Sequence, residues 1–299
     1  MPQPKTRRYG TPLRYPGGKQ RLWPFVAELL ETNALDGGDY VEPYAGGAGV
    51  AIELLLRDLV GVVHLNDSSK AVHSFWYSIL QHTDEFCGRV ADASLTIGEW
   101  TTQRDILRNP NRFASLELGF ALFYLNRTNR SGIPSGGVIG GLDQAGAWKI
   151  DARFPKTELI ERIRMIAARK DRIKLKNWDA ERFITEYVPN LPEQTLVYLD
   201  PPYYEQGHRL YLSRYTPDDH ARLATVIQEN LERPWIVSYD GVPPVLGFYG
   251  ERRHFLYDLQ YNAQTVRKGK EVFVFADTVQ IPGDSKVRAI NEAIEASAA

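Results

Sequence analysis

Residues 195 to 204 read TLVYLDPPYY, an apolar run that ends in an acid, two prolines and two tyrosines. The run Leu196 to Leu199 is short and has no polar alternation, which is typical of a strand buried on both faces of a parallel sheet. Such a strand must end at Pro201, because proline has no N–H to donate to a neighbouring strand. We therefore expect Asp200 at the carboxyl end of a central strand, where open α/β sheets bind their ligands.

The segment Asp-Pro-Pro-Tyr at this strand end suits one kind of substrate group, an NH2 on a planar ring. Its prolines fix the backbone, so the carbonyl of Pro201 can lie beside the Asp200 carboxylate as a second acceptor. An amine of this kind is a poor nucleophile, because its lone pair is delocalised into the ring. Two accepted hydrogen bonds favour a pyramidal nitrogen that can attack an electrophile, and Tyr203 can stack on the ring. The residues Asp200, Pro201, Pro202 and Tyr203 thus predict amino-group methylation, with a simple turn that closes a strand as the alternative.

A second pattern lies earlier in the chain, where a strand and a glycine-rich turn precede a helix. Residues 39 to 43 predict a short strand, residues 44 to 49 read YAGGAG, and an apolar helical pattern follows. This order is typical of the nucleoside-binding start of a doubly wound fold, in which glycines let a ligand approach the backbone. The next predicted strand, residues 62 to 65, ends at Asn66-Asp67, where such folds hold ribose hydroxyls with a carboxylate.

Together these features predict a nucleoside cofactor, and two details favour S-adenosylmethionine. The turn is not GxGxxG, which disfavours a dinucleotide, and Glu42 lies directly before it. An acid at that position suits a cation such as the α-amino group of S-adenosylmethionine, whose sulfonium is also the electrophile that the segment at Asp200 requires. A phosphate-binding loop at residues 17 to 19 is disfavoured, because Gln20 stands where Ser or Thr would bind magnesium.

From about residue 86 to 169 the alternation of strands and helices is lost. A helical pattern ends in residues 120 to 125, and the polar, basic residues 126 to 132 follow it. We expect these to form a mobile loop that presents Arg and Asn side chains to an anion or to base edges. Residues 101 to 180 are rich in Lys and Arg, although the formal net charge of the chain is -1, so this part could meet a polyanion. A structural lobe with a solvated, charged surface is the alternative.

The sheet pattern resumes at residues 173 to 176, and Asp179 follows it as a third acceptor at the ligand edge. We interpret Asp179 as a contact for the adenine amino group of the cofactor. A further buried strand is predicted at residues 235 to 238, and an antiparallel pair at residues 255 to 259 and 272 to 275.

The cysteine content and the lengths of the apolar runs argue against several classes of protein. The single cysteine, Cys87, excludes an internal disulfide, and no Cys and His spacing indicates a zinc site, so no metal is expected. The first residues lack an apolar signal segment, and no run approaches the roughly 18 apolar residues of a membrane helix. The sequence therefore predicts a cytoplasmic protein without membrane contact.

Four motifs occur in a fixed order along the chain: YPGGK at 15 to 19, VEPYAGGAG at 41 to 49, ND at 66 to 67 and DPPY at 200 to 203. With them the chain resembles the Dam-type DNA adenine-N6 methyltransferases, the D12 class of α-group amino-methyltransferases. The resemblance implies an α/β, Rossmann-like S-adenosylmethionine-dependent methyltransferase sheet with an inserted, mainly helical target-recognition domain. The discontinuous catalytic domain would comprise residues 1–85 and 170–299, and the DNA-binding target-recognition domain residues 86–169.

The same resemblance implies roles for individual residues. Glu42 would hold the amino group of the cofactor, Asp67 its ribose and Asp179 its adenine. The cofactor-binding residues would be Tyr15, Lys19, Glu42, Pro43, Tyr44, Gly46, Gly47, Gly49, Asp67 and Asp179. Lys19 would lie between the cofactor and a flipped adenine, whose N6 would be held by Asp200 and the Pro201 carbonyl while Tyr203 stacks on the ring.

For DNA recognition, Dam enzymes that read GATC resemble NRHGYNGL where this chain has NRTNRSGI at residues 126 to 133. The implied DNA contacts are Lys19, Asn126, Arg127, Asn129, Arg130 and Ser131. The aromatic residue that would wedge into the duplex is replaced by Arg130, which could read guanine instead. The implied partner is double-stranded DNA, a companion restriction endonuclease is a candidate partner, and we expect a bacterial or phage-encoded monomer.

Two other functions stay open at this point. A cytosine-N4 or RNA amino-methyltransferase is the nearest alternative, since Asp-Pro-Pro-Tyr suits exocyclic amines in general. A catalytically silent DNA-binding module is the alternative from another class. The presence of Asp200, Glu42 and Asp67 together favours an enzyme, because a silent module has no chemical need for all three.

Overall fold

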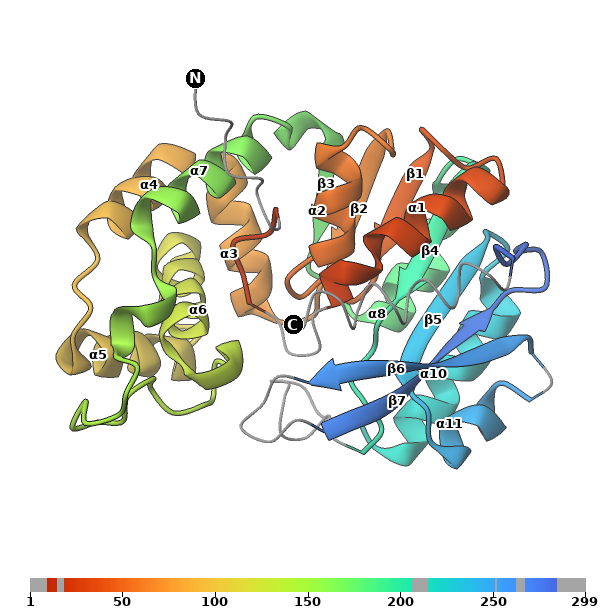
Figure 1. The fold of residues 1–299 in the computed structure, drawn as a ribbon. Coiled ribbons are helices and arrows are strands. Elements are labelled where there is room, and N and C mark those ends of the chain that lie inside the picture. The colour runs from red at the N-terminus through yellow and green to blue at the C-terminus, as the bar shows by residue number, and fades with distance from the viewer. Residues whose placement is uncertain (1–9, 15–18, 206–214, 251, 262–266, 284–299) are drawn as a thin grey trace, which may run out of the picture.

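The computed structural model describes residues 10–14, 19–205, 215–250, 252–261 and 267–283. Figure 1 shows a mixed sheet at one end of the molecule and a helical lobe at the other. In the described residues the sheet has seven strands in the order β3-β2-β1-β4-β5-β7-β6. The strands are β1 Asp39–Glu42, β2 Val62–Asn66, β3 Ile173–Lys176, β4 Thr195–Leu199, β5 Trp235–Asp240, β6 His254–Tyr261 and β7 Arg267–Phe275.

The strand order contains one reversal, and it lies between β1 and β4. The chain runs outward from β1 to β2 and β3, then returns to pair β4 with the other side of β1, and all these strands are parallel. Doubly wound sheets bind ligands at such a reversal, beyond the carboxyl ends of the strands. β4 is buried along its whole length, as its continuous apolar run predicts. The expected antiparallel pair is formed by β6 and β7, with β7 next to β5.

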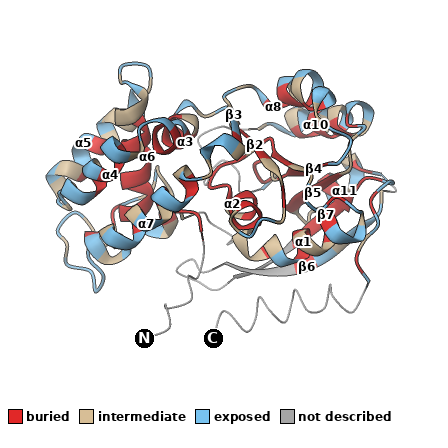
Figure 2. Ribbon diagram, turned by 90° about the horizontal axis from the view of Figure 1, so that it is seen from above, coloured by how far each residue is buried: buried red, intermediate tan, exposed pale blue. Residues whose placement is uncertain are grey.

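Helices cover both faces of the sheet. Figure 2 shows α1 and α2 on one side and α8 and α10 on the other. The helices around the sheet are α1 Trp23–Thr32, α2 Gly49–Leu56, α3 Lys70–Gln81, α8 Ala180–Arg182, α10 Pro217–Asn230 and α11 Pro243–Phe248. Helix α10 begins with a capping box, because Thr216 accepts the Asp219 N–H and the Asp219 carboxylate accepts the Thr216 N–H. The predicted Rossmann-like α/β fold is confirmed.

The lobe consists of α4 Thr83–Asp92, α5 Ile97–Arg108, α6 Ser115–Thr128 and α7 Lys156–Ala167. Its core is aromatic. The rings of Phe75 and Phe123 are stacked with their centroids 6.0 Å apart, and the Phe86 ring packs edge-on against Phe123 at 5.6 Å. Helices α3 and α6 approach closely, since a Cβ on Gly119 would lie 2.6 Å from the Ser74 carbonyl oxygen. Helix α3 thereby joins the lobe to the sheet.

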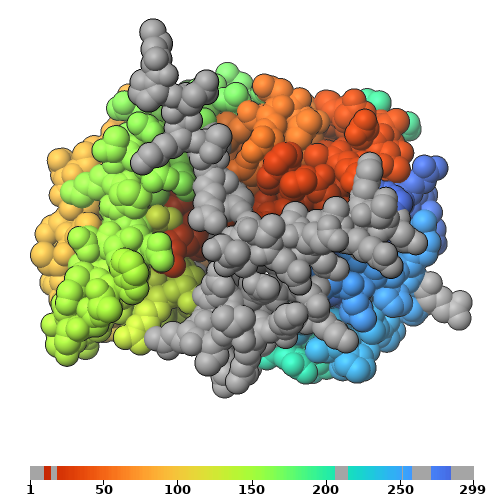
Figure 3. All heavy atoms as spheres, viewed as in Figure 1, coloured from red at the N-terminus to blue at the C-terminus, as the bar shows by residue number. Residues whose placement is uncertain are grey.

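The described part of the N-terminal segment, residues 10–14, lies between these two parts. In the space-filling view it is the red patch beside the green surface of the lobe (Figure 3). Its backbone is fixed to α6, because the Arg14 N–H donates to Asn126 and Arg127 donates to the Pro12 carbonyl. No helix among the described residues is long and apolar enough to cross a membrane.

Candidate active site at the carboxyl edge of the sheet

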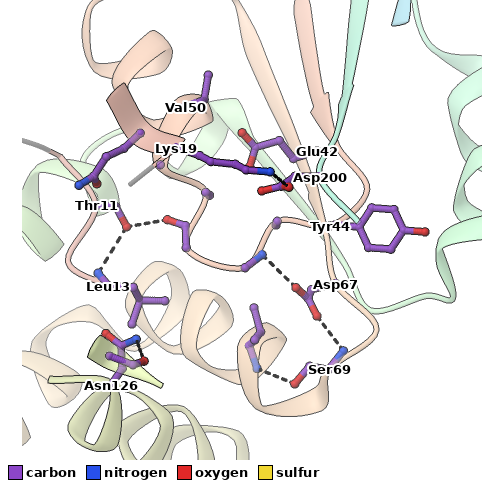
Figure 4. Close-up of a pocket in the computed structure, with 18 of the residues that line it drawn as sticks. Thr11, Leu13, Lys19, Glu42, Tyr44, Val50, Asp67, Ser69, Asn126 and Asp200 are labelled. Carbon is purple, nitrogen blue, oxygen red and sulfur yellow. Dashed lines mark hydrogen bonds and ion pairs between the residues drawn. The ribbon is translucent and has the colours of Figure 1, made fainter. Parts of the chain in front are cut away.

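A pocket opens beyond the carboxyl ends of β1 and β4, at the reversal of strand order (Figure 4). Most of its lining comes from the sheet edge and the N-terminal segment, and the lobe closes one side. Residues of the sheet edge that line it are Glu42, Tyr44, Gly46, Gly47, Gly49, Asp67, Tyr198, Asp200 and Pro202. The N-terminal segment adds Thr11, Leu13, Lys19 and Gln20, and the lobe adds Leu122, Asn126, Gly132 and Pro134.

The glycine-rich turn after β1 is held by contacts from α3 and from the N-terminal segment. Gly46 has a φ of 45°, in the left-handed region that favours glycine. Its carbonyl accepts the indole N–H of Trp76 at 2.9 Å, and the Gly47 carbonyl accepts the Thr11 hydroxyl at 2.6 Å. A Cβ on Gly49 would lie 2.7 Å from the Cβ of Gln20, so the start of α2 also packs closely. The turn is therefore fixed while its backbone lines the pocket.

Glu42, at the end of β1, is a nearly buried acid in this lining, only 5% exposed. One of its oxygens accepts the Ala51 N–H at 3.0 Å. Burial and, to a smaller extent, the nearby charge of Asp200 raise the pKa of Glu42 to about 8, and the hydrogen bond from Ala51 opposes this shift. The ionised form of such a carboxylate is best stabilised by a cation inside the pocket.

Asp67, at the end of β2, is the second acid of the lining. Its two oxygens accept the N–H groups of Gly46 and Ser69, each at 2.9 Å (Figure 4). Burial raises its pKa to about 6, and both hydrogen bonds oppose that shift. The carboxylate thus bridges the glycine-rich turn and the N-terminus of α3, and each oxygen has a further lone pair for a ligand hydroxyl.

The other predicted cofactor residues lie differently. Asp179 caps α8, accepting the N–H groups of Glu181 and Arg182 at 3.0 and 3.2 Å, and it is exposed and outside the pocket lining. The Pro43 carbonyl accepts the Asn66 side chain at 3.0 Å. Tyr44 lines the pocket but points away from Asp200 (Figure 4), and its hydroxyl lies 3.0 Å from that of Tyr215. Tyr15 lies outside the described residues.

Asp200 follows β4, as the sequence predicts, and its carboxylate pairs with the Lys19 ammonium (Figure 4). The Ser238 hydroxyl lies 3.0 Å from Lys19 Nζ and donates to Asp200 at 3.3 Å. Burial raises the pKa of Asp200, although Lys19 opposes the shift. Burial alone would lower the pKa of Lys19, but the charges of Asp200 and Glu271 outweigh it and raise that pKa.

Tyr203, the last residue of the Asp-Pro-Pro-Tyr segment, is 4% exposed. Its ring centroid lies 4.8 Å from Lys19 Nζ, and its hydroxyl donates to the carboxylate of Glu271 on β7. The structure therefore brings Asp200, Tyr203 and Lys19 together, as the sequence predicts, and adds Glu271 and Ser238. Each of these two has a faint signal in the sequence, a polar residue within or directly before an apolar strand run.

The predicted DNA-binding loop needs a correction. Helix α6 continues to Thr128, three residues beyond the expected end at Leu125, because the polar side chains of its last turn find partners inside the protein. Asn126 accepts the Arg14 N–H and donates to the carbonyls of Arg14 and Gly132.

Two further residues of this group are also buried. Arg127 Nε donates to the Arg153 carbonyl at 2.6 Å, and burial lowers the Arg127 pKa to about 9. Asn129 accepts the indole N–H of Trp100 at 2.6 Å. Asn126, Arg127 and Asn129 are therefore engaged inside the protein in this structure, and their contact with DNA stays a prediction. Arg130 is exposed and Ser131 is half-buried, so these two stay available.

Within the described part of the chain, no group of three or more His, Cys, Asp and Glu side chains is arranged to hold a metal ion. The acids of the pocket are instead spaced along its wall. Glu42 and Asp67 each stand at the end of a different strand, and Asp200 at the end of a third.

Comparison with known proteins extends this picture. Two structures of the rRNA methyltransferase aviRa from Streptomyces viridochromogenes are similar to this chain. The first has 14% identity and a TM-score of 0.40, and the match covers 90% of this chain and 91% of that chain. The second has 13% identity and a TM-score of 0.34, and the match covers 91% of this chain and 86% of that chain. No curated protein matches the sequence. Residues 15–262 match the family model of the D12 class N6 adenine-specific DNA methyltransferases. This match spans most of the chain and the whole pocket edge from Lys19 to Asp200, and it confirms the resemblance seen in the four motifs. The chain therefore belongs to the D12 class of N6 adenine-specific DNA methyltransferases.

Proposed function

We propose that the protein methylates N6 of an adenine flipped out of double-stranded DNA, with S-adenosylmethionine as the methyl donor and Asp200 to Tyr203 as the catalytic segment. Membership of the class makes it an adenine-specific DNA methyltransferase, which needs a methyl donor. The observation that carries the residue assignment is the single pocket shared by Asp200, Glu42 and the turn at Gly46 to Gly49.

The chemistry of the residues that line the pocket fits S-adenosylmethionine. Glu42 is a buried acid in the pocket lining whose ionised form a cation would stabilise, so it suits the ammonium of the amino-acid part. Asp67 suits the ribose hydroxyls, and the Gly46 to Gly49 turn lines the pocket, so a ligand can lie against its backbone. When bound, S-adenosylmethionine supplies an electrophilic methyl group. Asp179 and Tyr15 stay predicted contacts.

The role of Asp200 follows from its charge and its place. Its carboxylate and the Pro201 carbonyl accept the two N6 hydrogens and favour a pyramidal nitrogen, whose lone pair is no longer delocalised into the ring. Methyl transfer would form one N–C bond at N6, break the bond between the donor's sulfur and its methyl carbon with S-adenosylhomocysteine as the leaving group, and release one N6 proton. Asp200 is suited to hold that proton, since burial raises its pKa above the ordinary range of a carboxyl. Tyr203 provides the ring on which the base stacks.

We assign DNA recognition to the lobe of residues 86–169. Four of its residues reach the pocket wall, so a duplex bound by the lobe would present a flipped base beside Asp200. Flipping costs a few kcal/mol of stacking and pairing, which contacts to the DNA must offset. The exposed Arg130 is the residue of the predicted set best placed for such a contact. A companion restriction endonuclease and a monomeric state stay predictions.

The test is methyl transfer in a purified system. The protein is incubated with isotope-labelled S-adenosylmethionine and either duplex DNA or RNA, and the nucleosides are identified by mass spectrometry. We expect labelled N6-methyladenine from DNA. Label in RNA alone, or in N4-methylcytosine without N6-methyladenine, would contradict the proposal.

A further inference from the structure

Glu271 is a fully buried acid, 0% exposed, in the strand next to β5. Its neighbours along β7, residues 272 to 275, are apolar and buried. A carboxylate in such surroundings is costly unless donors surround it. Three are present, for the Tyr203 hydroxyl donates to Oε1, the Tyr257 hydroxyl donates to Oε2 at 2.5 Å, and Lys19 Nζ lies 3.5 Å from Oε2.

Lys19 therefore lies between two carboxylates, those of Asp200 and Glu271. In the structure it is closer to Asp200. Asp200 is also the acceptor that the target amine needs, and an ammonium on that carboxylate competes with the N6 hydrogens for its lone pairs. Productive binding of the base requires Lys19 to move away from Asp200 without losing a negative partner.

Glu271 meets that requirement. It is already within ion-pair distance of Lys19 and lies outside the pocket lining, so the base does not occupy it. If Lys19 pairs with Glu271, Asp200 is left as the anion that faces the amine.

The second contact of Glu271 concerns the ring on which the base stacks. The Tyr203 hydroxyl is tied to Glu271 although the two residues are 68 positions apart in the sequence. Tyr203 comes directly after two prolines, so its backbone is restricted at one end and its hydroxyl at the other. Both restraints together define the plane of the ring.

We propose that Glu271 is a positioning residue: it holds the hydroxyl of Tyr203 and takes over Lys19 when the target amine binds Asp200. This inference rests on the proposed function of the site. It assigns to β7 a part in base binding that the four sequence motifs do not indicate.

The experiment uses the full chain, saturating S-adenosylmethionine and a DNA duplex that contains the sequence methylated by the wild-type protein. Single-turnover methylation gives the rate of the chemical step, and 2-aminopurine at the target position reports base flipping by fluorescence. Cofactor affinity, DNA affinity and the melting temperature are measured alongside. The variants are Glu271→Gln, Tyr203→Phe and, as a matched control, Glu53→Gln, which neutralises another buried acid, 3% exposed, away from Asp200.

For Glu271→Gln we expect the single-turnover rate to fall about tenfold or more and the fluorescence change to shrink. The variant lacks the carboxylate to which Lys19 would move, so Lys19 stays paired with Asp200. Cofactor and DNA affinity should stay within about twofold of wild type, since Glu271 does not line the pocket. Tyr203→Phe should slow the step about three- to tenfold with the ring retained. The folded Glu53→Gln protein should have the single-turnover rate of the wild type.

A Glu271→Gln protein with wild-type rate and fluorescence overturns the inference. If that variant does not fold, Tyr203→Phe decides, and a wild-type rate there overturns it. A wild-type protein that makes no N6-methyladenine would instead refute the proposed function, so the two failures are distinguishable.

Discussion

The ammonium of Lys19 pairs with the carboxylate of Asp200, although the two residues are 181 positions apart in the sequence. The contact joins the turn before α1 to the end of β4, across the reversal of strand order. It places one cation against the acid that we propose as the catalytic residue. Substitutions around this pair, and around the pocket next to it, should separate cofactor binding, DNA binding and chemistry.

Asp200→Ala should bind S-adenosylmethionine with nearly wild-type affinity and lose methyl transfer by about a hundredfold or more. The acid contributes an acceptor for the amine and, through its raised pKa, a place for the leaving proton. Calorimetric titration of the cofactor and a transfer assay on the same preparation check both parts. Activity equal to wild type would remove the mechanism.

Glu42→Gln should weaken binding of S-adenosylmethionine and remove part of the pH dependence of stability. In the folded, ligand-free protein the Glu42 pKa is about 8, above the ordinary value of 4.5. The folded state then keeps a proton that the unfolded chain releases, so the free energy of unfolding falls as pH rises from about 4.5 to about 8.

The measurement is the melting temperature of both proteins without cofactor at about pH 5 and about pH 8. We expect wild type to lose more stability than Glu42→Gln over this range. Equal losses would mean that Glu42 is ionised in the ligand-free pocket. Asp67, with a pKa of about 6, also lowers the free energy of unfolding as pH rises to about 6. It does so equally in both proteins, so its effect cancels when the two losses are compared.

Gly46→Ala should reduce cofactor affinity, with Gly37→Ala as its control. Both glycines have positive φ, 45° and 73°, so each alanine costs about 1 kcal/mol of backbone strain. Of the two, only Gly46 lines the pocket, so we expect only its added methyl group to reduce the space for the cofactor. Melting temperatures should fall alike, whereas titration should show weaker binding for Gly46→Ala alone. Equal affinities would place the cofactor elsewhere.

Arg130→Ala and Arg127→Ala should act on different properties. Arg130 is exposed, so its loss should weaken DNA binding and leave the melting temperature unchanged. A smaller salt slope would identify a phosphate contact, and an altered sequence preference would identify a base contact. Arg127 donates to two backbone carbonyls, so Arg127→Ala should destabilise the fold by about 2 kcal/mol. Unchanged DNA binding and preference in Arg130→Ala would refute its assignment.

The sheet edge could be predicted from the sequence because its signals are local. A buried strand that ends at Asp200, a glycine-rich turn after Glu42 and a second strand that ends at Asp67 each occupy a few consecutive residues. The parallel fold then brings these strand ends to one edge. The lobe could be predicted as helical for the same reason.

The contacts of Glu271 and the end of α6 could not be predicted in this way. The burial of the Glu271 carboxylate is explained by its contacts with Tyr203 and Lys19, which are distant from it in the sequence. Asn126 and Arg127 have the composition of a loop, and polar residues are usually exposed. Here they are buried because the Arg14 backbone and the Arg153 carbonyl bind them, and a local pattern contains no sign of such partners.

The measurement that tests the central claim most directly is methylation-sensitive long-read sequencing of DNA from a methylase-free host that expresses this chain. Nucleoside mass spectrometry identifies the modified base, and a host expressing Asp200→Ala serves as the control. We predict N6-methyladenine within a defined sequence context for wild type and none for the variant. N4-methylcytosine without N6-methyladenine, or equal methylation in both hosts, would contradict the account.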